Sequence, residues 1–164
     1  MKKLFKSFIF LLLAFNTVNV TAQKISVWKS TDLDSFIKQT YKPTIINFWA
    51  TFCKPCIEEL PYFQQAAKKY DSAGLRLVLV SLDLKEAYPK KIQSFANKIK
   101  ITSPLFFLDE TNADIFCPIV DKSWSGAIPA SLFINNKTGY RKFFEDQLSE
   151  KQLEEEIQKL LGNK

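Results

Sequence analysis

The chain of 164 residues contains no histidine and only four glycines. The absence of histidine excludes serine–histidine and cysteine–histidine catalysis, histidine zinc sites and histidine-ligated haem. With four Gly and seven Pro, the composition does not fit a collagen-like or low-complexity chain. Long apolar stretches are also missing: the main run spans eight residues, whereas a membrane helix needs about 20. The three cysteines are therefore the most reactive groups in the chain.

The first 22 residues differ in composition from the rest. Three lysines lie within residues 1–6, the apolar run fills residues 8–15, and small and polar residues lead to Ala22. This three-part layout is typical of a secretory signal peptide. We predict a signal peptide over residues 1–22 that is cleaved on export, which leaves no stable membrane anchor. An uncleaved anchor or a buried helix is the alternative.

The remaining residues, 23–164, are predicted to form one domain. Hydrophobic residues make up 46% of the chain, which is enough for a real core. Removing the three N-terminal lysines leaves 20 basic against 17 acidic residues. No block of five Lys or Arg occurs in this part of the chain, so nucleic-acid binding is not supported. Export would place the thiols in an oxidising compartment.

Strand and helix patterns alternate along the first two thirds of this domain, and a hairpin and a helix close it. Apolar and β-branched runs predict strands at residues 25–28, 44–49, 75–82, 105–108, 130–134 and 140–144. Apolar residues at helical spacing predict helices at residues 31–37, 57–70, 87–99, 113–120 and 149–161. This order predicts an α/β fold with a central mixed sheet and helices on both faces.

Cys53 and Cys56 lie between the buried strand at residues 44–49 and the next helix. The start of a helix supplies unpaired N–H groups and a partial positive charge, and both favour a thiolate. The spacing places the second sulfur one helical turn behind the first, within reach of a disulfide. These features favour redox catalysis. A structural disulfide, a copper-binding pair and half of a zinc site are the alternatives, although only Cys117 is left to complete a zinc site.

The segment at residues 47–56, NFWATFCKPC, resembles the active-site segment of the thioredoxin superfamily. The continuation at residues 57–62, IEELPY, is similar to the exported TlpA/ResA-like thiol-disulfide oxidoreductases. The resemblance implies a thioredoxin fold and an enzyme that exchanges thiols and disulfides, with no organic cofactor and no metal. It also favours a reductant role in a bacterial periplasm.

The resemblance implies a role for each residue of this segment. Cys53 would be the attacking thiolate, Cys56 the resolving thiol, and the oxidised state a Cys53–Cys56 disulfide. Thioredoxins carry a buried aspartate where this chain has Asn47, and an amide cannot serve as acid or base. Glu59 lies one turn after Cys56, and the resemblance to the TlpA/ResA-like group implies that it carries the proton of the second thiol, as the matching glutamate does there. The alternative is that Glu59 or Glu58 is simply a solvated charge on the helix.

Further residues are implied to contact the substrate. In a thioredoxin fold the Ile128–Pro129 peptide bond would be cis and would face the two cysteines. Pro129 would block metal capture, and the backbone of Ile128 would hydrogen-bond the partner's extended chain. Trp49 would pack beside the site. Phe52, in place of a more usual tryptophan, would form part of the surface that contacts the partner.

The predicted partners are proteins with disulfide or dithiol groups, and the resemblance alone implies a DsbD/CcdA-like membrane electron donor. A thiol peroxidase is one alternative, but the proline-threonine-cysteine pattern of such enzymes is absent around Cys53. A copper-binding module is another, but such relatives pair Cys-x-x-x-Cys with a histidine, and this chain has neither. A third is an assembly module whose thiols are structural.

Cys117 lies in an apolar stretch and is predicted to be buried and inert, with a third redox thiol or an intermolecular bridge as alternatives.

Overall fold

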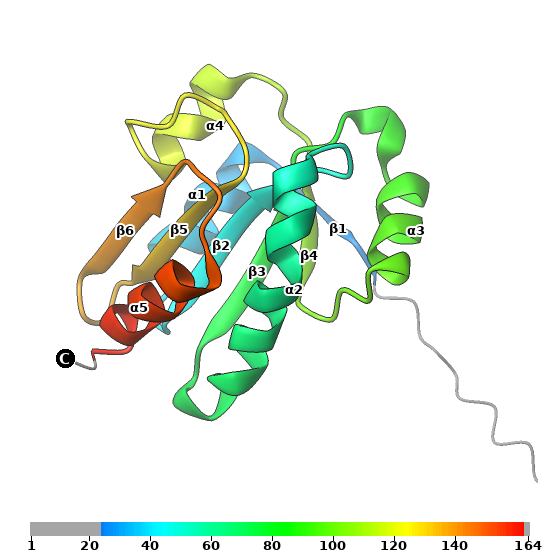
Figure 1. Cartoon of the computed structure of the whole chain (residues 1–164). Coiled ribbons are helices and arrows are strands. Elements are labelled where there is room, and N and C mark those ends of the chain that lie inside the picture. The colour runs from blue at the N-terminus through cyan, green and yellow to red at the C-terminus, as the bar shows by residue number, and fades with distance from the viewer. Residues whose placement is uncertain (1–23, 163–164) are drawn as a thin grey trace, which may run out of the picture.

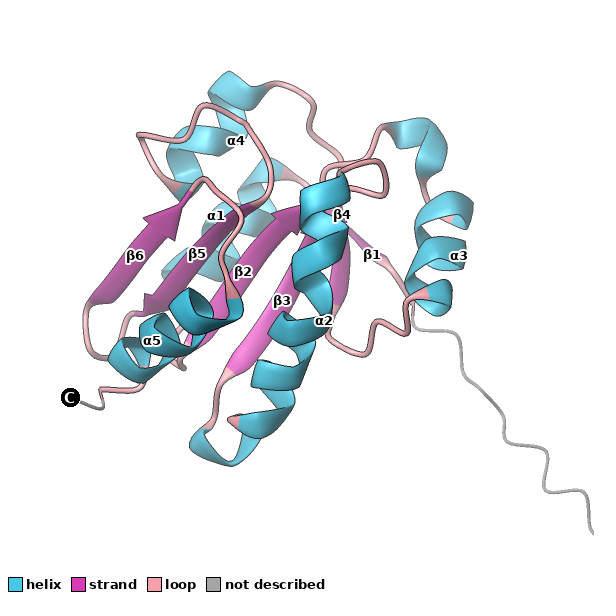
Figure 2. Cartoon of the chain, viewed as in Figure 1, coloured by secondary structure: helices cyan, strands magenta, loops and turns pink. Residues whose placement is uncertain are grey.

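A six-stranded mixed sheet forms the centre of the molecule, and helices cover both of its faces (Figure 1; Figure 2). The computed structural model describes residues 24–162. The strands are β1 (Ser26–Trp28), β2 (Thr44–Trp49), β3 (Arg76–Ser81), β4 (Leu105–Leu108), β5 (Ala130–Asn135) and β6 (Tyr140–Phe144). The helices are α1 (Ser30–Lys38), α2 (Lys54–Lys69), α3 (Lys90–Lys98), α4 (Ala113–Val120) and α5 (Glu150–Leu160). The predicted signal peptide, residues 1–22, lies outside the described residues.

The strands are arranged in the order β1-β4-β3-β2-β5-β6. The first four are parallel to one another, whereas β5 and β6 run antiparallel to their neighbours. Every residue of the central strand β2 is buried. A strand that is covered on both faces is rich in apolar residues, which is why the mainly apolar, β-branched segment at residues 44–49 predicts a strand. The predicted mixed sheet with helices on both faces is confirmed.

Alternate residues of the central strands point into two separate cores. In β3, Leu77 and Leu79 face the core under α2, α3 and α5, while Val78 and Val80 face the core under α1 and α4. This alternation is the two-residue period of a strand. The three helices on the first face and the two on the second are seen on opposite sides of the sheet in Figure 1. The burial therefore fixes the register of the strands.

One predicted helix begins later than expected. The sequence predicts a helix over residues 87–99, but α3 begins at Lys90, and a 3-10 turn covers Lys85–Ala87. Pro89 is the reason, because the residue before a proline is pushed away from helical backbone angles. Tyr88 accordingly has an extended conformation with φ −85° and ψ 137°. The helix predicted over residues 57–70 also has different bounds, because α2 spans Lys54–Lys69.

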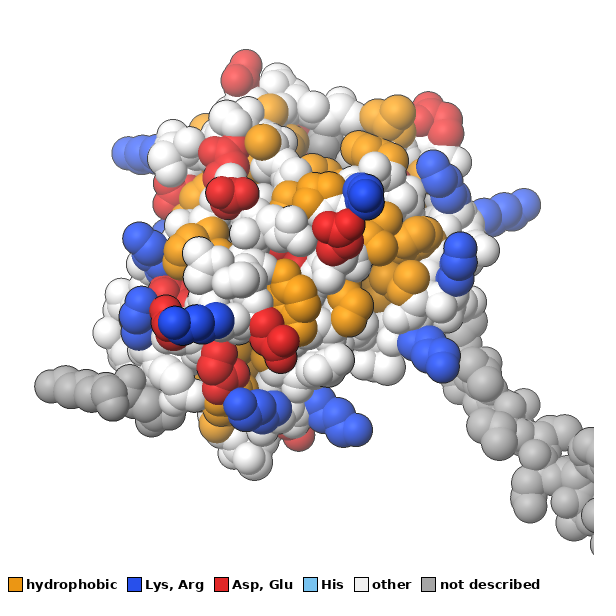
Figure 3. Space-filling view, in the orientation of Figure 1, with side chains coloured by type: hydrophobic (Ala, Val, Ile, Leu, Met, Phe, Trp, Pro, Cys, Tyr) orange, Lys and Arg blue, Asp and Glu red, His pale blue; other side chains and the backbone are white. Residues whose placement is uncertain are grey.

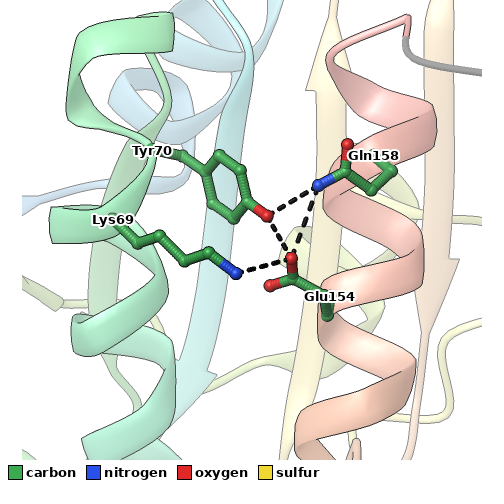
Figure 4. Close-up of polar contacts among 4 residues, drawn as sticks. All are labelled: Lys69, Tyr70, Glu154 and Gln158. Carbon is green, nitrogen blue, oxygen red and sulfur yellow. Dashed lines mark hydrogen bonds and ion pairs between the residues drawn. The ribbon is translucent and has the colours of Figure 1, made fainter.

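A group of polar side chains joins the C-terminal end of α2 to α5 (Figure 4). Glu154 of α5 accepts a hydrogen bond from the Tyr70 hydroxyl, and its Oε1 lies 2.8 Å from the Lys69 Nζ. Gln158 donates to the Tyr70 hydroxyl at 2.6 Å. These contacts fix the C-terminal end of α2 against α5. The other end of α2 carries the two cysteines.

Candidate redox-active site

The two cysteines lie at the edge of the sheet where the parallel strands end. The chain leaves β2 at Trp49 and enters α2 at Lys54, with Cys53 as the N-cap residue. Because β5 runs antiparallel to β2, with Ala130 opposite Phe48, the residues that precede β5 lie beside this edge. The carbonyl oxygen of Ile128 is thereby placed 3.7 Å from Cys53 Sγ. The topology thus brings together two segments 75 residues apart.

Cys53 and Cys56 form a disulfide with a Cα–Cα distance of 5.3 Å. The backbone N–H of Cys56 donates to Cys53 Sγ at 3.3 Å, so the first sulfur receives one of the unpaired N–H groups of the helix start. Cys53 is 6% exposed, whereas Cys56 is completely buried. An incoming sulfur can therefore approach Cys53 more readily than Cys56. Pro55 lies in the first turn of α2, where its missing N–H costs little.

Glu59 is a buried carboxyl group one helical turn after Cys56. Its side chain is 0% exposed and accepts hydrogen bonds from Asn47 Nδ2 at 2.7 Å and from the backbone N–H of Leu148 at 3.1 Å. Desolvation raises the pKa of Glu59 to about 7, against the lowering effect of these two hydrogen bonds. The alternative of a solvated helix charge is therefore wrong for Glu59. It describes the neighbouring Glu58, whose side chain is 53% exposed.

Asn47 lies between Glu59 and β5. Its amide nitrogen donates to Glu59 and also to Ser131 Oγ, at 3.0 Å. Its oxygen Oδ1 is buried without a hydrogen-bond partner among the described residues. An amide can present either its N–H group or its oxygen to a neighbour. If the amide turns over, Oδ1 can accept a hydrogen bond from protonated Glu59, so this pair suits both protonation states of the carboxyl group.

The residues predicted to contact a partner fall into two groups. Phe52 is 65% exposed, and the Ile128–Pro129 peptide bond is cis as predicted, with Ile128 partly exposed and Pro129 buried. Trp49 is different, because it is completely buried, with its ring 5.8 Å from that of Phe95. It therefore offers no surface to a partner in this structure, although it packs in the same core as the disulfide.

The contribution of Leu84 to the apolar surface at Phe52 was not predicted. Phe52 and Leu84, which is 63% exposed, border a cavity of about 210 Å³. Its other lining residues are Asp83, Glu86, Ala87 and Lys91. On the face shown in Figure 3, hydrophobic side chains gather around the beginning of α2 and between α2 and α3. Leu84 gave no signal in the sequence, because a single apolar residue in a loop has no pattern.

Asp83 is a second residue that the sequence reasoning missed. It is 4% exposed and accepts hydrogen bonds from the Thr51 backbone at 3.0 Å, the Thr51 hydroxyl at 2.5 Å and the Ser81 hydroxyl at 2.8 Å. The carboxylate thereby holds the loop that leads to Cys53. The position of Asp83 was predictable in principle, because it follows the buried strand β3. Binding sites of parallel sheets form at the edge where the strands end.

Trp124 is a core residue that lies close to the segment before Pro129. It is 5% exposed and packs in the core under α4, and its indole N–H donates to the carbonyl oxygen of Ala127 at 2.8 Å. The ring is therefore a core side chain that also fixes the segment before Pro129.

Cys117 is buried at 4% exposure and is not part of a disulfide, as predicted. Desolvation raises the pKa of its thiol, which keeps it protonated and unreactive. Within residues 24–162, no cluster of three or more His, Cys, Asp or Glu side chains is arranged to hold a metal ion. In the same range, no helix combines the length and apolar character needed to cross a membrane.

Comparisons with known proteins agree with this geometry. Residues 15–139 match the AhpC/TSA family. A segment of 64 residues is 38% identical to the thiol-disulfide oxidoreductase ResA of Oceanobacillus iheyensis, covering 39% of this chain and 32% of that protein. The chain thus spans about a third of that relative. Over 122 residues it is 29% identical to sporulation thiol-disulfide oxidoreductase A of Bacillus subtilis, covering 74% of this chain and 70% of the relative.

The fold has a solved counterpart. The crystal structure of a thioredoxin-related protein from Neisseria meningitidis serogroup B matches with a TM-score of 0.64 and 23% identity, covering 77% of this chain and 91% of the other. The predicted thioredoxin fold and the resemblance to ResA-like proteins are both confirmed. Because the family match extends over most of the sequence, the chain belongs to the AhpC/TSA family and has a thioredoxin-like fold.

Proposed function

We propose that the protein is a thiol-disulfide oxidoreductase that acts on the cysteines of exported proteins through Cys53 and Cys56. The observation that carries this proposal is the unequal placement of the two sulfurs. Cys53 caps a helix and is 6% exposed, while its partner sulfur at Cys56 is completely buried. Relatives named thiol-disulfide oxidoreductases add support.

In the dithiol state Cys53 is the nucleophile. The helix start and the N–H of Cys56 favour its thiolate. The thiolate attacks one sulfur of the partner's disulfide, so that a Cys53–partner bond forms and the partner's S–S bond breaks. The second partner sulfur leaves as a thiolate and takes up a proton.

Cys56 completes the exchange. Its thiol gives its proton to the carboxylate of Glu59, one helical turn away on the same face. The Cys56 thiolate then attacks Cys53, the Cys53–Cys56 disulfide forms, and the partner's first sulfur is released as a thiolate. Two electrons have passed from the protein dithiol to the partner. A carboxyl group whose pKa is about 7 is suited to move this proton near neutral pH.

The partner is held as an extended chain. Ile128 is partly exposed and lies beside Cys53, and its backbone would hydrogen-bond this chain next to Pro129. Phe52 and Leu84 would pack against an apolar side chain near the partner's cysteine, because Phe52 precedes Cys53 in the chain and both of these exposed side chains line one cavity.

The location and electron source are also proposals. The basic, apolar and small segments of residues 1–22 support export to a bacterial periplasm with cleavage of the signal peptide. Resemblance alone supports a DsbD/CcdA-like membrane donor and a reductant role. Sequencing the mature N-terminus after expression in a bacterium tests the first proposal, because cleavage at the predicted site would leave Gln23 as the first residue.

The activity is tested by reduction of a disulfide-linked peptide with dithiothreitol as the electron source. We expect the wild-type protein and Cys117→Ala to accelerate reduction equally, and Cys53→Ala to lose the activity. Acceleration that persists in Cys53→Ala would contradict the proposal. Turnover of hydrogen peroxide that survives Cys56→Ala would instead favour a thiol peroxidase.

A further inference from the structure

The turn before Pro129 is held by the carboxylate of Glu145. Glu145 lies in the segment between β6 and α5. Its Oε1 accepts hydrogen bonds from the backbone N–H of Ser125 at 2.9 Å, from the backbone N–H of Ala127 at 3.1 Å, and from the Ser125 hydroxyl. A single oxygen thus organises three donors on a turn of three residues.

The same turn is fixed on its other sides. The Trp124 indole N–H holds the carbonyl oxygen of Ala127 at 2.8 Å. Gly126 has φ +95°, and a Cβ atom there would lie 3.4 Å from Ala113 Cβ of α4. The turn therefore sits directly on α4 in a conformation that favours glycine. Glu145, which follows β6, holds the turn through the hydrogen bonds that it accepts.

The residue that follows this turn is Ile128, whose carbonyl oxygen lies 3.7 Å from Cys53 Sγ. A backbone that must bind an extended partner has to be fixed before the partner arrives, because ordering it on binding would cost affinity. Although desolvation opposes it, hydrogen bonds from Ser125 and Ala127 lower the pKa of Glu145 below its usual range. The carboxylate is then ionised at neutral pH, which strengthens the hydrogen bonds it accepts.

We propose that Glu145 is a positioning residue for substrate binding, which holds residues 125–127 so that the Ile128 backbone is presented beside Cys53. This inference rests on the proposed function. It assigns Glu145 a role in binding peptide and protein disulfides, which use the backbone at Ile128. Small disulfides that have no peptide chain do not need it.

Two substrates separate this role from catalysis. Peptide-disulfide reduction is compared with reduction of bis(2-hydroxyethyl) disulfide, which has no peptide backbone. For Glu145→Ala we expect KM for the peptide to rise about tenfold, because the Ile128 backbone then has to be ordered when the peptide binds. We expect kcat for the peptide, and the rate with the small disulfide, to stay within about twofold of wild type. Glu145→Gln retains an acceptor oxygen and should recover most of the KM.

A matched control and a spectroscopic measurement complete the test. Glu155→Ala removes an exposed α5 carboxylate whose ion pair with Lys151 is 3.8 Å long, and it should leave KM unchanged. Amide hydrogen exchange at Ala127 should accelerate about tenfold in Glu145→Ala, while exchange at Leu148 stays as in wild type.

The outcomes separate this inference from the proposed function. If the wild-type protein reduces both disulfides and Glu145→Ala keeps the wild-type KM for the peptide, the positioning role is wrong and the proposed function stands. Equal losses with both disulfides would also overturn it, because they indicate a general structural role. If the wild-type protein reduces neither disulfide, the proposed function fails and the role in binding fails with it.

Discussion

The substitution Glu59→Gln tests the central electrostatic feature of the site. Glutamine has nearly the same shape but cannot ionise. It can still accept a hydrogen bond from the Leu148 N–H, and its amide can donate to Asn47 Oδ1, which has no partner among the described residues. The variant should therefore fold, and its stability should differ from that of wild type mainly through the missing titration.

The size of this stability difference follows from the pKa of Glu59. Burial raises the pKa of Glu59 from the ordinary 4.5 to about 7 in the folded protein, so the folded state binds this proton more tightly than the unfolded chain. The resulting stabilisation is complete below pH 4.5 and is lost as the pH rises through about 7. At 1.36 kcal/mol per pKa unit, the wild-type protein should lose about 3 kcal/mol across this window through Glu59 alone. Glu59→Gln should not show this loss.

The assay is urea unfolding of the oxidised proteins at a series of pH values from about 4 to about 9. The oxidised state is used because Cys53 and Cys56 do not titrate in a disulfide. Relative to wild type, Glu59→Gln should gain about 3 kcal/mol in unfolding free energy over this range. Glu58→Gln, which alters an exposed neighbour, should run parallel to wild type. If Glu59→Gln also runs parallel, the pKa of Glu59 is ordinary and the reasoning is refuted.

Three further predictions follow from named contacts. Glu59→Gln should slow peptide-disulfide reduction by at least about tenfold near neutral pH, measured by steady-state kinetics, and an unchanged rate would remove Glu59 from proton transfer. Asp83→Ala leaves the buried Thr51 N–H without its acceptor and should lower the unfolding free energy by about 3 kcal/mol; a loss below about 1 kcal/mol would contradict this. Tyr70→Phe removes the hydroxyl between α2 and α5 (Figure 4) and should cost about 1 kcal/mol in the same urea assay, and no cost would show the contact to be neutral.

Much of the fold was predictable because its signals are local. The buried strand β2 reads as a mainly apolar and β-branched run, and α4 and β6 have the bounds that the sequence predicts. The order of the strands was not predictable, since β1 pairs with β4, which lies about 80 residues further along the chain. Pairing across such distances depends on the whole core, and no local pattern encodes it.

At the site, too, the local patterns were predictable and the tertiary contacts were not. The spacing of Cys53 and Cys56 at a helix start is a local pattern, and the sequence places it correctly. The hydrogen bonds of Glu145 to residues 20 and 18 positions away are tertiary, and nothing around Glu145 marks it. The burial of Trp49 was underestimated because an aromatic residue beside a reactive group suits a substrate contact and a core position equally well in sequence.

The most direct test of the account is to trap the exchange at its first step. Cys56→Ala, mixed with a disulfide-linked peptide and quenched with acid, should accumulate a mixed disulfide, and peptide mapping by mass spectrometry should locate it at Cys53. Cys53→Ala treated in the same way should accumulate none. A mixed disulfide at Cys117, or none in Cys56→Ala, would contradict the claim that Cys53 is the attacking sulfur.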